Sequence, residues 1–192
     1  MVIKDHILIE DNFLKPFEVC QILKYANQAH YDVGGVFKGN EKEAVEDKNI
    51  RVVETTPLRQ GAEFSPEEQF WNNYMCEKVR MAIHIYKEKL NAKHLTLASI
   101  NDIAILKYEV GGKYNLHTDH CARVPRSMSL IFLLNNDYEG GELEFCNHDE
   151  QESHTIDIQV GRVIIWPSNH IFPHRVKPVI KGTRYSIVSW CL

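Results

Sequence analysis

The chain has 192 residues, a length that suits one well-buried domain rather than two. Hydrophobic residues make up 44% of it and charged residues 25%, which excludes a disordered or fibrous chain. The net charge is -4 and no dense basic block occurs, so nucleic acid is not an expected partner. The start lacks the apolar run of a signal peptide, and no window is apolar enough for a membrane span. We therefore expect a cytoplasmic protein without membrane contact.

The five cysteines are scattered along the chain and never form a C-x-x-C pair. We therefore do not expect these cysteines to form a zinc site or a redox dithiol. We expect them to be reduced thiols.

Two helices are predicted in the N-terminal half. Pro16 suits a first helical turn, and apolar residues recur at steps of three and four over about residues 16–29. Further along, Ser65, Pro66 and Glu68 form the pattern of a capping box. A helix of about 25 residues should follow, with one apolar face that packs on a sheet. That face is formed by Trp71, Met75, Val79, Ala82, Tyr86 and Leu90.

Residues 34–56 are polar, contain glycine and show no steady periodicity, except for a possible short strand around residues 50–53. Segments of this length inside a compact domain are uncommon unless they are functional or disordered. The segment is also too charged to bury much apolar surface. We expect a mobile loop that acts as a lid, with a solvated connector as the alternative.

From about residue 95 onward the pattern changes to short β-rich runs separated by turn signals. The runs are TLASI, IAILKYE, SMSLIFLLN, ELEF, HTIDIQV, RVIIWP, RVKPVI and RYSIVSW. Strands at this spacing predict a sandwich, barrel or jelly roll. The expected fold class is α+β and mainly β, with two helices packed against a double-sheeted β core.

Three histidines stand in an H-x-[DE] pattern that suits metal binding. The three matches are His30-Tyr31-Asp32, His117-Thr118-Asp119 and His148-Asp149-Glu150. On an extended strand residues i and i+2 point to the same face, which favours His117 and Asp119 as a pair of ligands. His30 precedes a glycine loop and His148 lies in a turn-like run, so both are weaker candidates.

A third ligand would complete a facial 2-His-1-carboxylate site, which suits ferrous iron and leaves positions open for a bidentate co-substrate and oxygen. His174, just before a β-rich run, is the candidate, whereas His170 lies in a turn-like sequence. Arg184 follows ten residues after His174 within another β-rich run. A cation there is costly to bury without an anionic partner, and a structural ion pair is the simple alternative.

Four stretches in this order resemble the iron and 2-oxoglutarate-dependent dioxygenases of the prolyl 4-hydroxylase type. They are YEVGGKYNLHTD at 108–119, RSMSLIFLLNNDYEGGELEF at 126–145, GRVIIWP at 161–167 and HRVKPVIKGTRYSIVSW at 174–190. The resemblance covers about residues 95–192, and the helical half is similar to that family's support helices. It implies a single domain over residues 1–192. Residues 1–94 would form the helical support and substrate lid, and residues 95–192 a double-stranded β-helix, or jelly roll, as catalytic core.

The resemblance also implies a site. His117, Asp119 and His174 would hold Fe(II), and the guanidinium of Arg184 would pair with the far carboxylate of 2-oxoglutarate. Leu133 stands where some oxygen-sensing relatives have a tyrosine that helps to hold the co-substrate, so Arg184 is expected to lean on Ser129 or Thr183. The residues implied around the co-substrate are, besides Arg184, Tyr108, Tyr114, Ser129 and Trp190. A packed core tyrosine or indole is the alternative for the aromatic ones.

The implied reaction is hydroxylation of a C–H bond with 2-oxoglutarate and O2, and ascorbate is an additional candidate cofactor. The presence of Asp119 favours hydroxylation over halogenation. Trp190 stands where nucleic-acid repair demethylases carry a second arginine, which disfavours that class. The expected substrate is a proline-containing peptide or protein, with Arg51 in the lid near it, and the expected state is a monomer or weak homodimer. The alternatives are a hydroxylase of another side chain or a free amino acid, and a non-catalytic metal-binding jelly-roll module.

Overall fold

The computed structural model describes residues 3–36, 44–147 and 150–192. Two facing β-sheets form the body of the protein, and every pairing among the described strands is antiparallel. The larger sheet contains, in spatial order, β1 (Leu8–Glu10), β11 (Val163–Pro167), β7 (Met128–Leu133), β14 (Arg184–Cys191), β5 (Ile100–Tyr108), β4 (Glu54–Pro57) and β2 (Asp32–Val33). The smaller contains β10 (Ser153–Thr155), β9 (Leu143–Cys146), β12 (His174–Val176), β6 (Lys113–His117) and β3 (Arg51–Val52).

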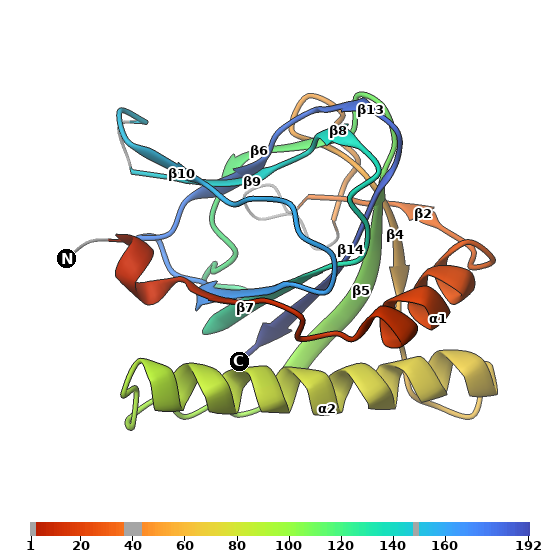
Figure 1. Ribbon diagram of the computed structural model, residues 1–192, viewed down its shortest axis with the longest axis horizontal. Coiled ribbons are helices and arrows are strands. Elements are labelled where there is room, and N and C mark those ends of the chain that lie inside the picture. The colour runs from red at the N-terminus through yellow and green to blue at the C-terminus, as the bar shows by residue number, and fades with distance from the viewer. Residues whose placement is uncertain (1–2, 37–43, 148–149) are drawn as a thin grey trace.

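The two sheets face one another across an apolar interior, and the helices cover the outer face of the larger sheet (Figure 1). A short pairing of β8 (Glu139–Gly140) with β13 (Val179–Lys181) closes one end. Successive side chains of β5 point to opposite faces of the larger sheet. Ile103 and Ile105 pack in the core beneath the helices, whereas Leu106 and Tyr108 pack in the core between the two sheets. The mainly β jelly-roll fold predicted from the sequence is confirmed.

The two helices lie where the apolar spacing places them. α1 (Pro16–Ala26) is shorter than expected, because the hydroxyl of Tyr31 donates to the Ala26 carbonyl where the helix ends. α2 (Pro66–Lys89) begins at Ser65, whose side chain accepts from the backbone N–H of Glu68. The carboxylate of Glu68 accepts from Nε of Arg59 at 2.9 Å. The helix therefore keeps the Ser65 cap but not the second half of the expected capping box. The buried side chains of α2 are Trp71, Met75, Val79, Ala82, Ile83 and Tyr86.

Residues 34–56 contain more structure than the expected mobile loop. β3 joins the smaller sheet through Arg51 opposite Tyr114, and β4 joins the larger sheet through Thr55 opposite Leu106. Val36 and Val45 form an isolated bridge, and residues 37–43 lie outside the described part of the chain. The β-branched residues of the run RVVETT favour this extended pairing, so the segment links the two sheets at one side of the site.

The strand predictions were also wrong at three places. Residues 96–99 and 156–160 are not strands, and β6, which the apolar runs did not indicate, is one. β6 shows only intermediate or exposed positions, so it lacks the apolar alternation that identifies a half-buried strand. Its place in the sheet comes from its neighbours on both sides, β12 and β3.

The smaller sheet also carries a buried ion-pair network around Glu144 of β9. Arg175 donates to Glu144 at 2.6 Å, Lys177 lies 2.9 Å from it, and Thr155 donates at 3.0 Å. Burial alone would raise the pKa of Glu144, but these hydrogen bonds outweigh it and lower the pKa to about 2.

None of the helices among the described residues combines the length and the apolar character that crossing a bilayer requires.

Candidate active site

Two neighbouring strands of the smaller sheet bring the predicted metal ligands together. His117 is the last residue of β6 and His174 the first of β12, and the two residues pair directly across the sheet. Asp119 follows two residues after His117. Its Oδ1 lies 3.6 Å from Nε2 of His117, and its Oδ2 lies 3.5 Å from Nε2 of His174. Among the described histidines, cysteines and acids, this is the cluster with metal-binding geometry.

The backbone fixes which nitrogen of each histidine faces the cluster. Nδ1 of His117 lies 2.8 Å from the carbonyl of Asn115, and Nδ1 of His174 lies 3.0 Å from the carbonyl of Phe172. Because a carbonyl only accepts, each Nδ1 carries the proton and donates it. Both Nε2 lone pairs therefore point toward Asp119, in the orientation that a metal requires.

The protonation states also suit a metal. Burial lowers the pKa of His174 to about 4, against the opposing charge of Asp119, so its imidazole is neutral at pH 7. Burial would raise the pKa of Asp119, but the two histidines and a hydrogen bond from Ser129 outweigh it and hold the pKa well below its usual range. The site thus presents the neutral imidazole of His174 and the carboxylate of Asp119, with Nε2 of His117 beside them, a donor set that fits Fe(II).

A hydroxyl network orients the carboxylate of Asp119. Ser129 donates to Oδ2 of Asp119 at 2.6 Å, and its hydroxyl lies 2.7 Å from that of Ser168. Both serines are buried. The sequence placed Ser129 beside Arg184, whereas in the structure its hydroxyl contacts the Asp119 carboxylate.

Arg184, the first residue of β14, is a buried cation without an anionic partner among the described residues. Its side chain is 1% exposed, and its Nη1 donates to Ser186 at 2.7 Å. The guanidinium lies 5.0 Å from the ring centroid of Tyr108. Its Nε and Nη2 are buried and have no hydrogen-bond partner. Because burying such donors unpaired is costly, the geometry favours an anionic ligand at this point.

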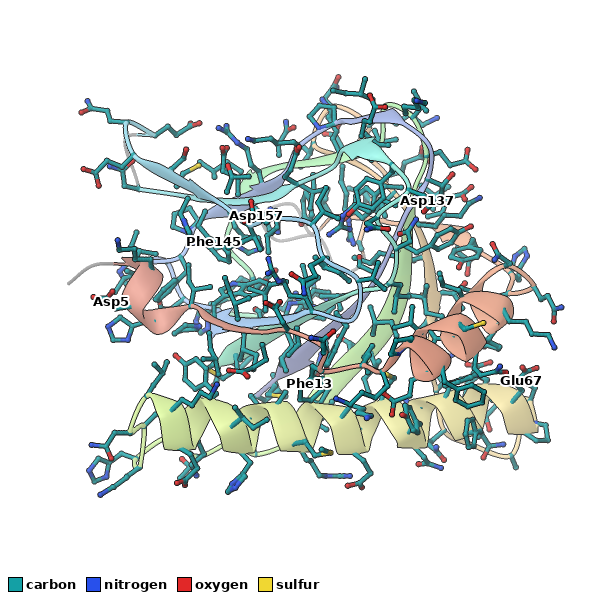
Figure 2. All side chains as sticks on the ribbon, in the orientation of Figure 1. Asp5, Phe13, Glu67, Asp137, Phe145 and Asp157 are labelled. Atoms are coloured by element: carbon teal, nitrogen blue, oxygen red, sulfur yellow. The ribbon has the colours of Figure 1, made fainter. Side chains whose placement is uncertain are left out.

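Aromatic rings enclose the metal-binding cluster. The ring of Tyr114 stacks on His117 with centroids 3.5 Å apart, and the guanidinium of Arg51 lies 4.7 Å above Tyr114. Phe145, which Figure 2 labels between the two sheets, has its ring centroid 5.2 Å from that of Trp166 and 5.6 Å from that of His174. Burial raises the pKa of Tyr114 to about 12, so its hydroxyl stays protonated.

A cleft of ≈ 580 Å³ lies beside the metal pocket, a space of ≈ 20 Å³ whose lining includes His117, Asp119 and His174. It shares four lining residues with the metal pocket, namely Arg51, Leu106, Val188 and Trp190. Beyond Trp190 its wall continues to Arg126, whose guanidinium lies 3.7 Å from the indole centroid and 3.5 Å from Asp102. Gly34, Gly35 and Ala44 form part of the other wall. The cleft therefore lies beside the metal pocket, and residues that precede β3 line part of it.

The other sequence candidates lie elsewhere. His30 is exposed and faces only Asp32, at 3.7 Å. His148 lies outside the described residues, and His170 is not part of the cluster. Thr183 uses its carbonyl to accept from Asn135.

Two residues of the site were missed by sequence reasoning. Ser186, which contacts Arg184, lies two residues after it and therefore on the same face of β14, so the strand period could have indicated it. Ser168, which contacts Ser129, follows β11 and carries no comparable signal.

Residues 103–192 match the family model of the 2OG-Fe(II) oxygenase superfamily. A PKHD-type hydroxylase of Gloeothece citriformis is 35% identical over 97 residues, which cover 47% of this chain and 42% of that protein. A PKHD-type hydroxylase of Pseudomonas fluorescens is 25% identical over 183 residues, which cover 90% of this chain and 72% of that protein. The chain thus spans less than half the length of the first of these curated relatives.

A solved prolyl hydroxylase from Trichoplax adhaerens, in complex with a peptide fragment of the hypoxia inducible factor oxygen degradation domain, has the same fold. The TM-score is 0.77 at 23% identity, and the match covers 98% of this chain and 84% of that one. The superfamily takes its name from 2-oxoglutarate and Fe(II), the two groups that the donor set and the unpaired arginine fit. Residues 103–192 of this chain are thus similar to the 2OG-Fe(II) oxygenase superfamily, and the chain has the fold of a solved prolyl hydroxylase.

Proposed function

We propose that this protein is an Fe(II)- and 2-oxoglutarate-dependent dioxygenase that hydroxylates proline in a peptide or protein. The observation that carries the proposal is the cluster of His117, Asp119 and His174 in a jelly roll that also buries an unpaired arginine. The names of the PKHD-type relatives and of the Trichoplax prolyl hydroxylase support proline as the target.

In this proposal each residue has a defined task. His117, Asp119 and His174 hold Fe(II), which when bound supplies the chemistry that couples oxidation of 2-oxoglutarate by O2 to oxidation of a C–H bond. Ser129 fixes the Asp119 carboxylate so that it does not rotate away from the histidines. Arg184 binds the far carboxylate of 2-oxoglutarate.

The ≈ 580 Å³ cleft is the proposed substrate channel. The cleft and the metal pocket meet at Trp190. A substrate residue that enters from this side would therefore reach the cluster. The aromatic rings around His117 and His174 exclude water from the reacting atoms. We further propose that residues 34–56 act as a substrate lid, with Arg51 at the boundary between cleft and pocket, and that residues 1–192 work as one domain.

The runner-up is hydroxylation of another side chain or of a free amino acid, which the open cleft also permits. A non-catalytic metal-binding jelly roll is disfavoured, because such a module has no use for a buried Arg184 with two unpaired donors. A cytoplasmic location, a monomeric or weakly dimeric state, the absence of nucleic-acid partners and a need for ascorbate stay predictions.

The test is turnover of proline-containing peptides with Fe(II) and 2-oxoglutarate, with products identified by mass spectrometry. We expect a gain of one oxygen atom on proline together with formation of succinate. The matched control is His174→Ala. If the oxygen atom is found on a different side chain, or only on free amino acids, that group replaces proline as the proposed substrate. Succinate formed equally by His174→Ala would contradict it altogether.

A further inference from the structure

The rings of the two candidate histidine ligands are held in different ways. His174 lies in the core with a side chain that is 4% exposed, and the rings of Phe145 and Trp166 lie 5.6 and 5.0 Å from it between centroids. His117 stands at the end of β6, and its side chain is 16% exposed. Tyr114 stacks on it with centroids 3.5 Å apart and planes 19° from parallel. The orientation of His117 therefore depends on its neighbours in β6 more than on the core.

A shift of register in β6 makes this stacking possible. Residues three apart on a regular strand point to opposite faces. His117 pairs with His174 and Tyr114 pairs with Val176, so three steps on β6 face two steps on β12. An extra residue of this kind is the mark of a β-bulge, which changes the direction of side chains and is common beside active sites. Here the shift brings Tyr114 and His117 together.

Arg51 of β3 extends the stack. It stands directly opposite Tyr114 in the sheet, and its guanidinium lies 4.7 Å from the centroid of the tyrosine ring. A planar guanidinium stacks well on an aromatic face. Its Nη1 also donates to the carbonyl of Gly35 at 2.8 Å, which holds the guanidinium in place. Arg51, Tyr114 and His117 thus form a continuous stack that runs from β3 to the metal pocket.

Asn115 joins the same stretch of chain to His117 by a second route. Its backbone N–H donates to the carbonyl of Ile50 at 2.9 Å, and its side-chain amide donates to the carbonyl of Asn49 at 2.8 Å. The carbonyl of Asn115 accepts from Nδ1 of His117 at 2.8 Å. Residues 49–51 therefore act on His117 both through the hydrogen bonds of Asn115 and through the ring of Tyr114.

We propose that Arg51 is a positioning residue of the metal site, which holds the ring of His117 in its ligating orientation through Tyr114. The inference rests on the proposed function, because it takes His117 as a metal ligand, and it gives Arg51 a task that requires no substrate. A displacement of residues 49–51 that moved Arg51 would also release His117. The segment that we propose as the lid is thereby coupled to the affinity for the metal.

Charge and position predict opposite effects of removing Arg51. A guanidinium that lines the metal pocket repels a divalent cation, so loss of the charge alone strengthens metal binding. Loss of the stack leaves His117 less well oriented and weakens metal binding. The direction of the change in affinity therefore separates the two effects.

The experiment measures the dissociation constant of Mn(II) in the absence of peptide and of 2-oxoglutarate. Arg51→Met should raise it about fivefold, which is less than the loss of a direct partner of a ligand causes. In the background of Tyr114→Leu, which removes the intervening ring, the same substitution should no longer raise it. Tyr114→Phe keeps the ring and should bind Mn(II) as the wild type does. The matched control is Arg126→Met, which removes another cation of the cleft, stacked on Trp190, and should not raise the constant.

The absorption spectrum of Co(II) in the site gives a second readout, which should shift in Arg51→Met and stay unchanged in Arg126→Met. An unchanged or lower dissociation constant in Arg51→Met, or an unchanged Co(II) spectrum, overturns the inference. An equal rise of the constant with and without the Tyr114 ring also overturns it, because Arg51 would then not act through Tyr114. Arg51→Gln replaces the methionine variant if that variant does not fold. Failure of the wild-type protein itself to bind Mn(II) would instead overturn the proposed function.

Discussion

Arg184 should lower the stability of the ligand-free protein and raise its affinity for 2-oxoglutarate, and Arg184→Met separates these two effects. The guanidinium buries Nε and Nη2 without partners. An unsatisfied buried donor costs about 1–3 kcal/mol. Methionine is apolar and removes that cost. It also removes the hydrogen bond to Ser186 and the contact with Tyr108, together worth about 1–3 kcal/mol.

With two such donors, the cost removed is about 2–6 kcal/mol against about 1–3 kcal/mol of lost contacts, so the midpoints predict that ligand-free Arg184→Met is more stable than the wild type by about 2 kcal/mol. The affinity for 2-oxoglutarate should move in the opposite direction. Removing one partner of a buried charged pair costs about 2–5 kcal/mol, which weakens binding from roughly 30-fold to several thousandfold.

Two measurements on the same variant check this prediction. Urea unfolding of the metal-free protein gives the free energy of unfolding, and titration of 2-oxoglutarate into the Mn(II) form gives the affinity. Arg184→Lys is the control, because it keeps the charge but loses the planar fork, and its affinity should lie between the other two. A marked loss of stability in Arg184→Met would show that the guanidinium is satisfied in the folded protein. Wild-type affinity in that variant would place the anchor elsewhere.

The remaining predictions concern the metal ligands, the lid and one ion pair. His117→Ala should abolish turnover and weaken Mn(II) binding while circular dichroism stays unchanged, and retained turnover would contradict its assignment as a ligand. Ser129→Ala should weaken Mn(II) binding about tenfold or more by releasing Asp119, and unchanged binding would show that the hydrogen bond is dispensable. Replacing residues 38–48 by a short Gly-Ser link should impair peptide hydroxylation more than uncoupled 2-oxoglutarate decarboxylation, whereas an equal fall in both would count against a lid. The pKa of Glu144 is lowered to about 2, so its ion pairs stabilise the fold fully above about pH 5 and are lost as the pH falls toward 2, at most about 3 kcal/mol. Glu144→Gln should flatten the stability profile over that range, and an unchanged acid slope would refute this.

The sequence was sufficient for the parts of the site that depend on local spacing. His117 and Asp119 could be predicted as neighbours from their spacing of two residues, although β6 ends at His117 and Asp119 lies just beyond the strand. The pairing of His174 with His117 joins residues far apart in the chain, and no periodicity within either strand predicts that register. The family resemblance, rather than residue spacing, supplied this part.

The parts that could not be predicted depend on packing. Ser129 was expected beside Arg184, but in the sheet it faces the carboxylate that follows β6. A short strand was expected around residues 50–53, where β3 lies, but residues 54–56 looked like part of a loop because the run is short and partly polar. Both runs form strands because an edge of each sheet is available to pair with them.

Thermal unfolding of the Mn(II)-loaded protein at increasing 2-oxoglutarate concentration tests the central claim most directly, because a ligand that binds only the folded state must raise the melting temperature. The site described by His117, Asp119, His174 and Arg184 predicts a rise that continues with ligand concentration and disappears in Arg184→Met. No rise in the wild-type protein, or the same rise in Arg184→Met, would contradict the assignment of this pocket to 2-oxoglutarate.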